Sequence, residues 1–246
     1  MKVEIQLRPK LVLRALLMVA LGLTAVSLVG QYYRYCLGCR AFLGLVSKFN
    51  LDAERNYPTW FSSFLLLGCS FLLFVIAGRE RAKGTRFARH WTLLAILFLG
   101  MSAEEVAGLH ELMDSYIRHH PSVHLSGFLF FSWVIPASII VTVVSLSYLR
   151  FLIHLPRRVR SLSLLAGAMY VGGALVMEMA AGKVFEVYGY DSFPYAVENA
   201  AEELLEMLGA IVFLRALLVY IETNGSGIET GPLGAKAAID SLWGVQ

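Results

Sequence analysis

Residues 91–116 read WTLLAILFLGMSAEEVAGLHELMDSY, and the two halves of this stretch have opposite properties. The first half is as apolar as a membrane helix, and a run of about 18 or more apolar residues is long enough to cross the hydrocarbon core. The second half carries five ionisable residues, namely Glu104, Glu105, His110, Glu111 and Asp114. Because a charged side chain in the membrane core costs at least about 2.5 kcal/mol, the stretch predicts a membrane helix that contributes to a polar site.

The composition of the whole chain also indicates a membrane protein. Of its 246 residues, 57% are hydrophobic and 16% are charged, and the mean hydropathy is +0.64, whereas ordinary soluble domains are about 25% charged. Backbone groups in lipid must form their hydrogen bonds within the segment, which favours helices. We therefore predict an all-α polytopic membrane domain over residues 1–223 and a cytoplasmic tail over 224–246. Six transmembrane helices are expected, over residues 11–29, 60–77, 91–112, 128–149, 162–181 and 197–221.

The basic residues are unevenly distributed along the chain, although the net charge is only +3. Lys and Arg collect before the first predicted span, between the second and third, and between the fourth and fifth. Basic loops face the cytoplasm, so we expect both termini inside a bacterial cytoplasmic (inner) membrane and most acidic residues toward the periplasm or cell exterior. The lipid bilayer is the partner that this pattern indicates; nothing in it indicates nucleic acid.

The last predicted span contains a second acidic stretch, VENAAEELLEMLGAIVFL, over residues 197–214. Its Glu198, Glu202 and Glu206 are spaced i, i+4, i+8, which places them on one helix face, and Glu203 lies beside that face. If the span begins near Val197, Glu206 lies roughly 13 Å inside the membrane at 1.5 Å per residue.

The third predicted span brings acidic residues to a similar depth. At about 100° per residue, Glu104 and Glu111 are nearly eclipsed, His110 falls on the same side, and Glu105 points away. If the helix leaves the core near Glu111, Glu104 lies roughly 10 Å inside. Glu178 lies close to the outer end of the fifth span. These positions predict an outward-facing Glu/His cavity among the third, fifth and sixth spans.

Carboxylates and imidazoles from facing helices are the groups that bind divalent metal ions in helix bundles. We therefore expect a metal ion, with iron, zinc and manganese as candidates, in this cavity. The candidate ligands are Glu104, His110, Glu111, Glu178, Glu202, Glu203 and Glu206, and the accessory candidates are Glu105, His120 and His124. Neither Glu-x-x-His nor His-Glu-x-x-His occurs in the chain, so this expectation depends on composition and position.

Three functions follow from these features. The first is a metal-binding membrane protein, including a metalloenzyme that acts on a lipid or a small periplasmic substrate. The second is a non-catalytic subunit of a larger membrane complex, with contacts through the small residues of span 162–181 and through the tail. The third is a cation or proton transporter. No residue is singled out as catalytic. Cys36 and Cys39 form a CxxC pair that suits a disulfide or a redox role, and Cys69 is expected to pack in the core.

Three segments resemble a family of uncharacterised bacterial multi-pass inner-membrane proteins. They are FNLDAERNYPTWFSSFLLL at 49–67, LFLGMSAEEVAGLHELM at 97–113 and ENAAEELLEMLGA at 198–210. Members share a similar Leu-Asp-x-Glu…Pro-Thr-Trp loop and an acidic helix with a late His-Glu pair. The resemblance implies the same multi-pass architecture and adds Glu54 to the accessory candidates, in an outer loop that caps the cavity.

Overall fold

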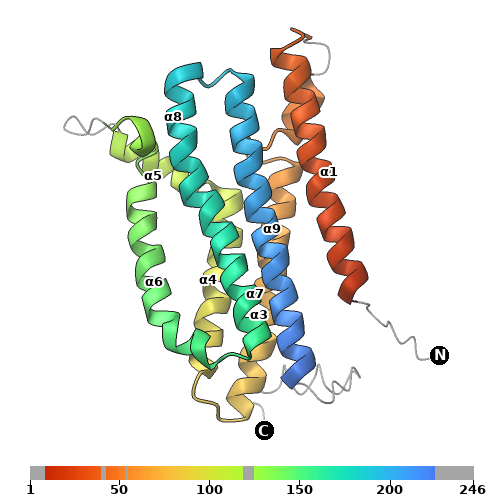
Figure 1. Ribbon diagram of the computed structural model, residues 1–246, viewed down its shortest axis with the longest axis vertical. Helices are drawn as coiled ribbons and strands as arrows, with labels where there is room; N and C mark the ends of the chain where they lie inside the picture. Colours follow the sequence, from red (N-terminus) through yellow and green to blue (C-terminus); the bar gives the residue numbers. More distant parts are fainter. Residues whose placement is uncertain (1–8, 40–42, 54, 119–124, 225–246) are drawn as a thin grey trace.

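The computed structural model describes residues 9–39, 43–53, 55–118 and 125–224, which contain helices and no strand. The long helices run side by side (Figure 1), joined by short connections. In chain order the α-helices are α1 (Pro9–Tyr35), α2 (Leu43–Phe49), α3 (Tyr57–Ala82), α4 (Ala88–Ala107), α5 (Leu109–Arg118), α6 (Val134–His154), α7 (Arg157–Val171), α8 (Glu178–Tyr188) and α9 (Phe193–Asn224). A 3-10 turn (Gly127–Leu129) precedes α6, and a π-helix (Gly172–Met177) joins α7 to α8.

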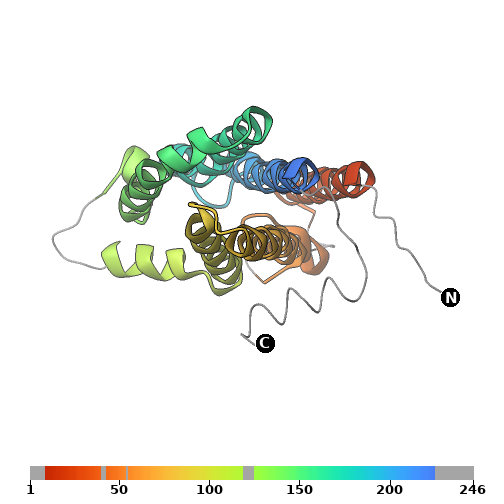
Figure 2. The ribbon, with the colours of Figure 1, turned by 90° about the horizontal axis from the view of Figure 1, so that it is seen from below.

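The helices form two layers with α9 in contact with both. Viewed from below, α6, α7, α9 and α1 lie in one row, and α3 and α4 lie in a second row beside it (Figure 2). Helix α9 packs against α1, α3, α7 and α8, and α3 packs along α4. The acidic face of α9 therefore lies inside the bundle, between α4 and the α7–α8 pair.

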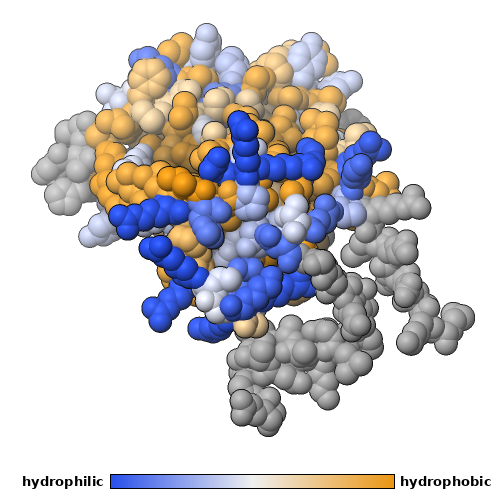
Figure 3. Space-filling model, turned by 60° about the horizontal axis from the view of Figure 1, so that its bottom comes forward, coloured by the Kyte–Doolittle hydropathy of each residue, from blue (hydrophilic) through white to orange (hydrophobic). Residues whose placement is uncertain are grey.

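Five of these helices are long and apolar enough to cross a membrane, namely α1, α3, α6, the continuous helix from Arg157 to Tyr188, and α9. Their outer surfaces are apolar; Leu146 of α6, for example, is 63% exposed. A polar end is bordered by this apolar surface (Figure 3). The predicted class of all-α membrane protein is thus confirmed. The predicted span over residues 91–112 stays a prediction. That span corresponds to α4, whose 20 residues extend about 30 Å at 1.5 Å per residue.

The predicted helix over residues 91–112 is broken at Gly108. This residue has a φ of 59° and ends α4 in the left-handed region, which glycine adopts without the steric cost of a Cβ atom. Helix α5 then lies across the direction of the long helices (Figure 2). Its exposed apolar residues include Leu112 and Tyr116, as expected of an amphipathic helix at a membrane interface.

The small residues of span 162–181 were expected to contact a partner protein. At least one of them instead allows close packing between helices of this chain. A Cβ atom on Gly173 would lie 2.8 Å from Cγ of Glu206, so this glycine lets the π-helix approach α9 closely. Gly167 and Gly172, by contrast, have no atom within 4 Å of such a Cβ position. The predicted tail covered residues 224–246; Asn224 is the last residue of α9, and residues 225–246 lie outside the described residues.

Reciprocal hydrogen bonds between two serines join α3 and α4. The hydroxyl of Ser63 donates to the carbonyl of Ser102 at 2.8 Å, and the hydroxyl of Ser102 donates to the carbonyl of Ser63 at 2.9 Å. Both hydroxyls thereby find partners in an apolar surrounding, where polar contacts between helices hold membrane bundles together.

Replacing both serines by alanine is expected to destabilise the detergent-solubilised protein by about 1–2 kcal/mol, the usual range for polar contacts between membrane helices. Thermal unfolding followed by size-exclusion chromatography measures the effect. Ser147→Ala is the matched control, because that exposed hydroxyl bonds only within its own helix, to the carbonyl of Val144. A double variant as stable as the control would show that the serine pair contributes nothing.

Candidate functional site

The acidic face predicted for α9 is present in the structure. Glu198, Glu202 and Glu206 follow one another along the helix, and Glu202 is the most buried of them, with 7% of its surface exposed. The carboxyls of Glu206, Glu203 and Glu198 all lie close enough to act electrostatically on Glu202. Charge of one sign is therefore concentrated along this part of α9.

Glu178 adds a carboxyl from the facing helix. It is the first residue of α8, directly after the π-helix, and its carboxyl lies close enough to act electrostatically on that of Glu202. Its Oε1 also accepts a hydrogen bond of 2.8 Å from the indole Nε1 of Trp133. The sequence placed Glu178 among the candidates; Trp133, which orients it, was not predicted.

Tyr170 of α7 lies beside the acidic part of α9, since the carboxyl of Glu206 lies close enough to act electrostatically on its hydroxyl. Seen from the sequence alone, Tyr170 is one aromatic residue in a membrane helix, where such residues are common. Its proximity to Glu206 depends on the close packing of α7 against α9, which no short pattern indicates. Tyr170 is therefore a site residue that sequence reasoning missed.

The break at Gly108 brings His110 back against α4. Its backbone N–H donates to Oε1 of Glu104 at 3.2 Å, and its ring Nδ1 lies 2.7 Å from the same oxygen. The ring packs on Trp133, with centroids 5.1 Å apart. Glu104 and His110 thus meet, as expected from their shared helix side, although the chain turns between them.

Glu105, expected to point away from Glu104, is the α4 residue that faces the acidic part of α9. Its carboxyl lies close enough to act electrostatically on both Glu203 and Glu206. Adjacent residues on a helix differ by about 100° in direction, so one helix can present Glu104 to His110 and Glu105 to α9. We define the acid cluster as Glu105, Glu178, Glu202, Glu203 and Glu206.

Asp114 contacts protein groups. Its Oδ1 accepts hydrogen bonds from the backbone N–H of Ser132 at 2.6 Å and from the Ser132 hydroxyl at 2.7 Å. Ser132 is fully buried. These bonds attach α5 to the segment that leads into α6, so Asp114 positions the residues around Trp133 and has a structural role.

The structure does not test every predicted ligand. Glu54, His120, His124 and the side chain of Glu111 lie outside the described residues. Within the described part of the chain, no three His, Cys, Asp or Glu side chains are arranged to hold a metal ion. Cys36, Cys39 and Cys69 are free thiols, and Cys69 is fully buried in the core, as expected.

Two carboxyls near the acid cluster have buried oxygens without a hydrogen bond. They are Oε2 of Glu202 and both carboxyl oxygens of Glu198. An acceptor buried without a partner costs about 1–3 kcal/mol, and a charged one costs more. A proton or a cation bound to these oxygens would therefore offset a free energy cost in this region.

The fold and the apolar helices define an integral membrane protein with carboxyls buried between α4, α8 and α9. The chain belongs to the family described as Domain of unknown function (DUF8692), whose model matches residues 11–221. No curated protein and no solved structure matches the chain.

Proposed function

We propose that this protein binds a divalent metal ion at the acid cluster. The observation that carries the proposal is Glu202, whose carboxyl is buried among like charges and has one oxygen without a hydrogen bond. A cation would offset both the repulsion and the loss of hydration, which otherwise make a buried carboxylate expensive. The oxygen-rich cluster with His110 nearby suits manganese or iron, and zinc less well.

Binding requires the carboxyls to move together. The carboxyls of Glu178 and Glu202 lie close enough to interact electrostatically, and we propose that the two hold one proton between them, because neighbouring like charges disfavour ionisation of both. Ligand groups must lose their protons when a metal ion binds. We propose that the ion replaces this proton and draws Glu178, Glu202 and Glu206 around itself by rotation of their side chains.

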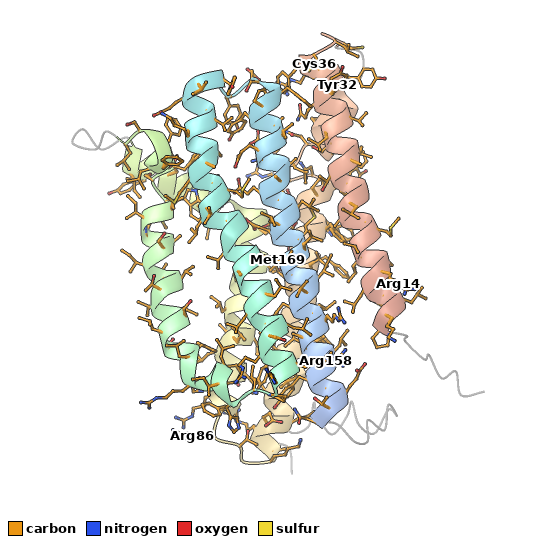
Figure 4. The ribbon with its side chains drawn as sticks, in the orientation of Figure 1. Arg14, Tyr32, Cys36, Arg86, Arg158 and Met169 are labelled. Atoms are coloured by element: carbon orange, nitrogen blue, oxygen red, sulfur yellow. The ribbon has the colours of Figure 1, made fainter. Side chains whose placement is uncertain are left out.

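The acid cluster is proposed to face the outside of a bacterial inner membrane. In support, Arg86 and Arg158 lie at one end of the bundle and Arg14 lies toward that end, while Tyr32 and Cys36 lie at the opposite end (Figure 4). The basic end belongs in the cytoplasm under the positive-inside rule. When α4 also crosses the membrane, the chain crosses it six times, and both ends of the described chain come to the cytoplasmic side.

The metal content of the detergent-purified protein, measured by plasma mass spectrometry, tests the proposal. We expect about one equivalent of manganese or iron in the wild type and less than about one fifth of that in Glu202→Gln, since a lost carboxylate ligand removes most of the affinity. Glu222→Gln is the matched control, because Glu222 is an exposed glutamate of the same helix. Thermal unfolding confirms that each variant is folded. Equal metal content in all three proteins, or a folded wild type without metal, would refute the proposal.

A second candidate function is proton binding, as in a proton relay or transporter. The proximity of the Glu178 and Glu202 carboxyls favours it, because neighbouring like charges disfavour ionisation of both and so favour a bound proton without any metal. Infrared spectroscopy detects protonated carboxyls directly. If the wild type contains no metal, a protonated-carboxyl band that disappears in Glu202→Gln and persists in Glu222→Gln would support this second function.

A further inference from the structure

A cavity of about 480 Å³ lies between the end of α1, the segment that precedes α3, and the turn between α8 and α9. None of its lining residues belongs to the acid cluster, and none of the functions above makes use of it. Its charged and aromatic lining residues are Arg34, Tyr35, Asp52, Arg55, Tyr190 and Asp191. Two guanidinium groups and two carboxylates therefore line one small space, with no net charge.

Arg34 is held in place on one side of this cavity. Its Nη2 lies 2.9 Å from Oδ1 of Asp191 in an ion pair, and its guanidinium lies 4.7 Å from the centre of the Tyr35 ring. The hydroxyl of Tyr35 donates to the same carboxylate at 3.3 Å. A guanidinium has five N–H donors, so Arg34 keeps donors for a ligand while Asp191 fixes its position.

Arg55 contributes the second guanidinium from a strained backbone. Its φ is 59°, in the left-handed region, where it is the one non-glycine residue of the described chain. Such a conformation costs a non-glycine residue free energy, and strain of this kind is concentrated at functional sites. Arg55 is exposed and forms no ion pair with any described residue. The exposed guanidinium of Arg55 beside this cavity is therefore suited to bind an anionic group of a ligand.

The cavity lies at the end of the bundle where tyrosines gather. Tyr32 and Cys36 mark this end in Figure 4, opposite Arg86 and Arg158. Tyr35 and Tyr190 line the cavity itself. Tyrosines are enriched at the level of the lipid headgroups, where the ring meets the acyl chains and the hydroxyl meets water. The exposed apolar surface of α1, which includes Val26 and Val29, leads from the membrane core toward this cavity.

We propose that this cavity binds the headgroup of a zwitterionic phospholipid, of the phosphoethanolamine type. The phosphate contacts Arg34 and Arg55, because guanidinium groups bind phosphate oxygens through paired N–H donors. The ammonium contacts Asp52 and Asp191. Equal numbers of cations and anions in the lining match a headgroup that carries one of each, whereas an anionic headgroup without an ammonium leaves the carboxylates unmatched.

Native mass spectrometry of the delipidated protein tests this inference with three ligands: phosphatidylethanolamine, phosphatidylglycerol and soluble phosphoethanolamine. We expect phosphatidylethanolamine to bind the wild type more tightly than either of the others. Arg55→Gln should weaken its binding at least about tenfold, the effect of losing a charge-assisted contact. Arg86→Gln, at the opposite end of the bundle, is the matched control and should bind as the wild type does.

A second variant tests the role of the carboxylates. Asp52→Asn should remove the preference for phosphatidylethanolamine over phosphatidylglycerol, because it deletes a partner of the ammonium while the guanidinium groups remain. Equal binding of the two lipids by the wild type, or unchanged binding by Arg55→Gln, would overturn the proposal. Soluble phosphoethanolamine binding as tightly as the lipid would also overturn it, by assigning the cavity to a water-soluble ligand. These readouts measure lipid and not metal, so they are independent of the acid cluster.

Discussion

Gly209→Leu is expected to lower the melting temperature of the detergent-solubilised protein strongly, whereas Gly167→Leu is expected to leave it nearly unchanged. A Cβ atom on Gly209 would lie 2.8 Å from the backbone N of Tyr170 and 3.0 Å from the carbonyl oxygen of Ala166. Both neighbours belong to the main chain of α7, which cannot rotate away as a side chain can. Overpacking typically costs about 1–3 kcal/mol, and a leucine that separates two helices should reach at least the upper end of that range.

Gly167 provides the matched control because it is an exposed glycine of α7 with nothing within 4 Å of a Cβ position. Thermal unfolding monitored by size-exclusion chromatography gives the melting temperatures of both variants and of the wild type. Separation of α7 from α9 should also move Tyr170 away from Glu206. Equal melting temperatures for the two leucine variants would mean that α7 and α9 are not packed as closely as described.

Gly173→Ala is expected to weaken metal binding strongly while every candidate ligand remains in the chain. The added methyl group would lie 2.8 Å from Cγ of Glu206 and 2.9 Å from the carbonyl oxygen of Glu202. Side-chain rotation can relieve the first contact, but only a shift of α9 away from the π-helix relieves the second. Either response moves Glu202 or Glu206 away from Glu178, and a displacement of about 1 Å is enough to spoil a binding site.

Gly172→Ala is the control for this second prediction, because the neighbouring glycine has open space at its Cβ position. Isothermal titration with manganese compares the three proteins, and we expect affinity at least about tenfold lower for Gly173→Ala, which corresponds to 1.4 kcal/mol. Normal affinity in a folded Gly173→Ala protein would show that the approach of the π-helix to α9 does not form the site.

Much of the architecture could be predicted from the sequence because a membrane imposes simple rules. Long apolar runs indicated the helices, and the spacing of Glu198, Glu202 and Glu206 indicated one acidic face on α9. Both features depend on local periodicity alone. Glu104 and His110 were also expected on one side of a continuous helix, but their hydrogen bond forms across the break at Gly108.

The remaining site residues depend on contacts that local periodicity does not contain. Gly108 lies in an apolar stretch where a glycine fits a continuous helix as well as a break, and only the packing of α5 decides between them. The break brings His110 back to Glu104, while Glu105, about 100° further round α4, faces α9. Trp133 and Tyr170 join the site through helix packing, and aromatic residues are too common in membrane helices to indicate such a role.

The π-helix over Gly172–Met177 makes the number of residues in this segment important in its own right. Tyr170 and Glu178 are eight residues apart, which on an uninterrupted α-helix turns their side chains about 80° away from each other. A π turn takes in an additional residue, and both side chains meet carboxyls of α9. A deletion of one residue here would turn all of α8 by about 100° relative to α7 and swing Glu178 out of reach of Glu202. Insertions and deletions should therefore be excluded from this segment in related chains.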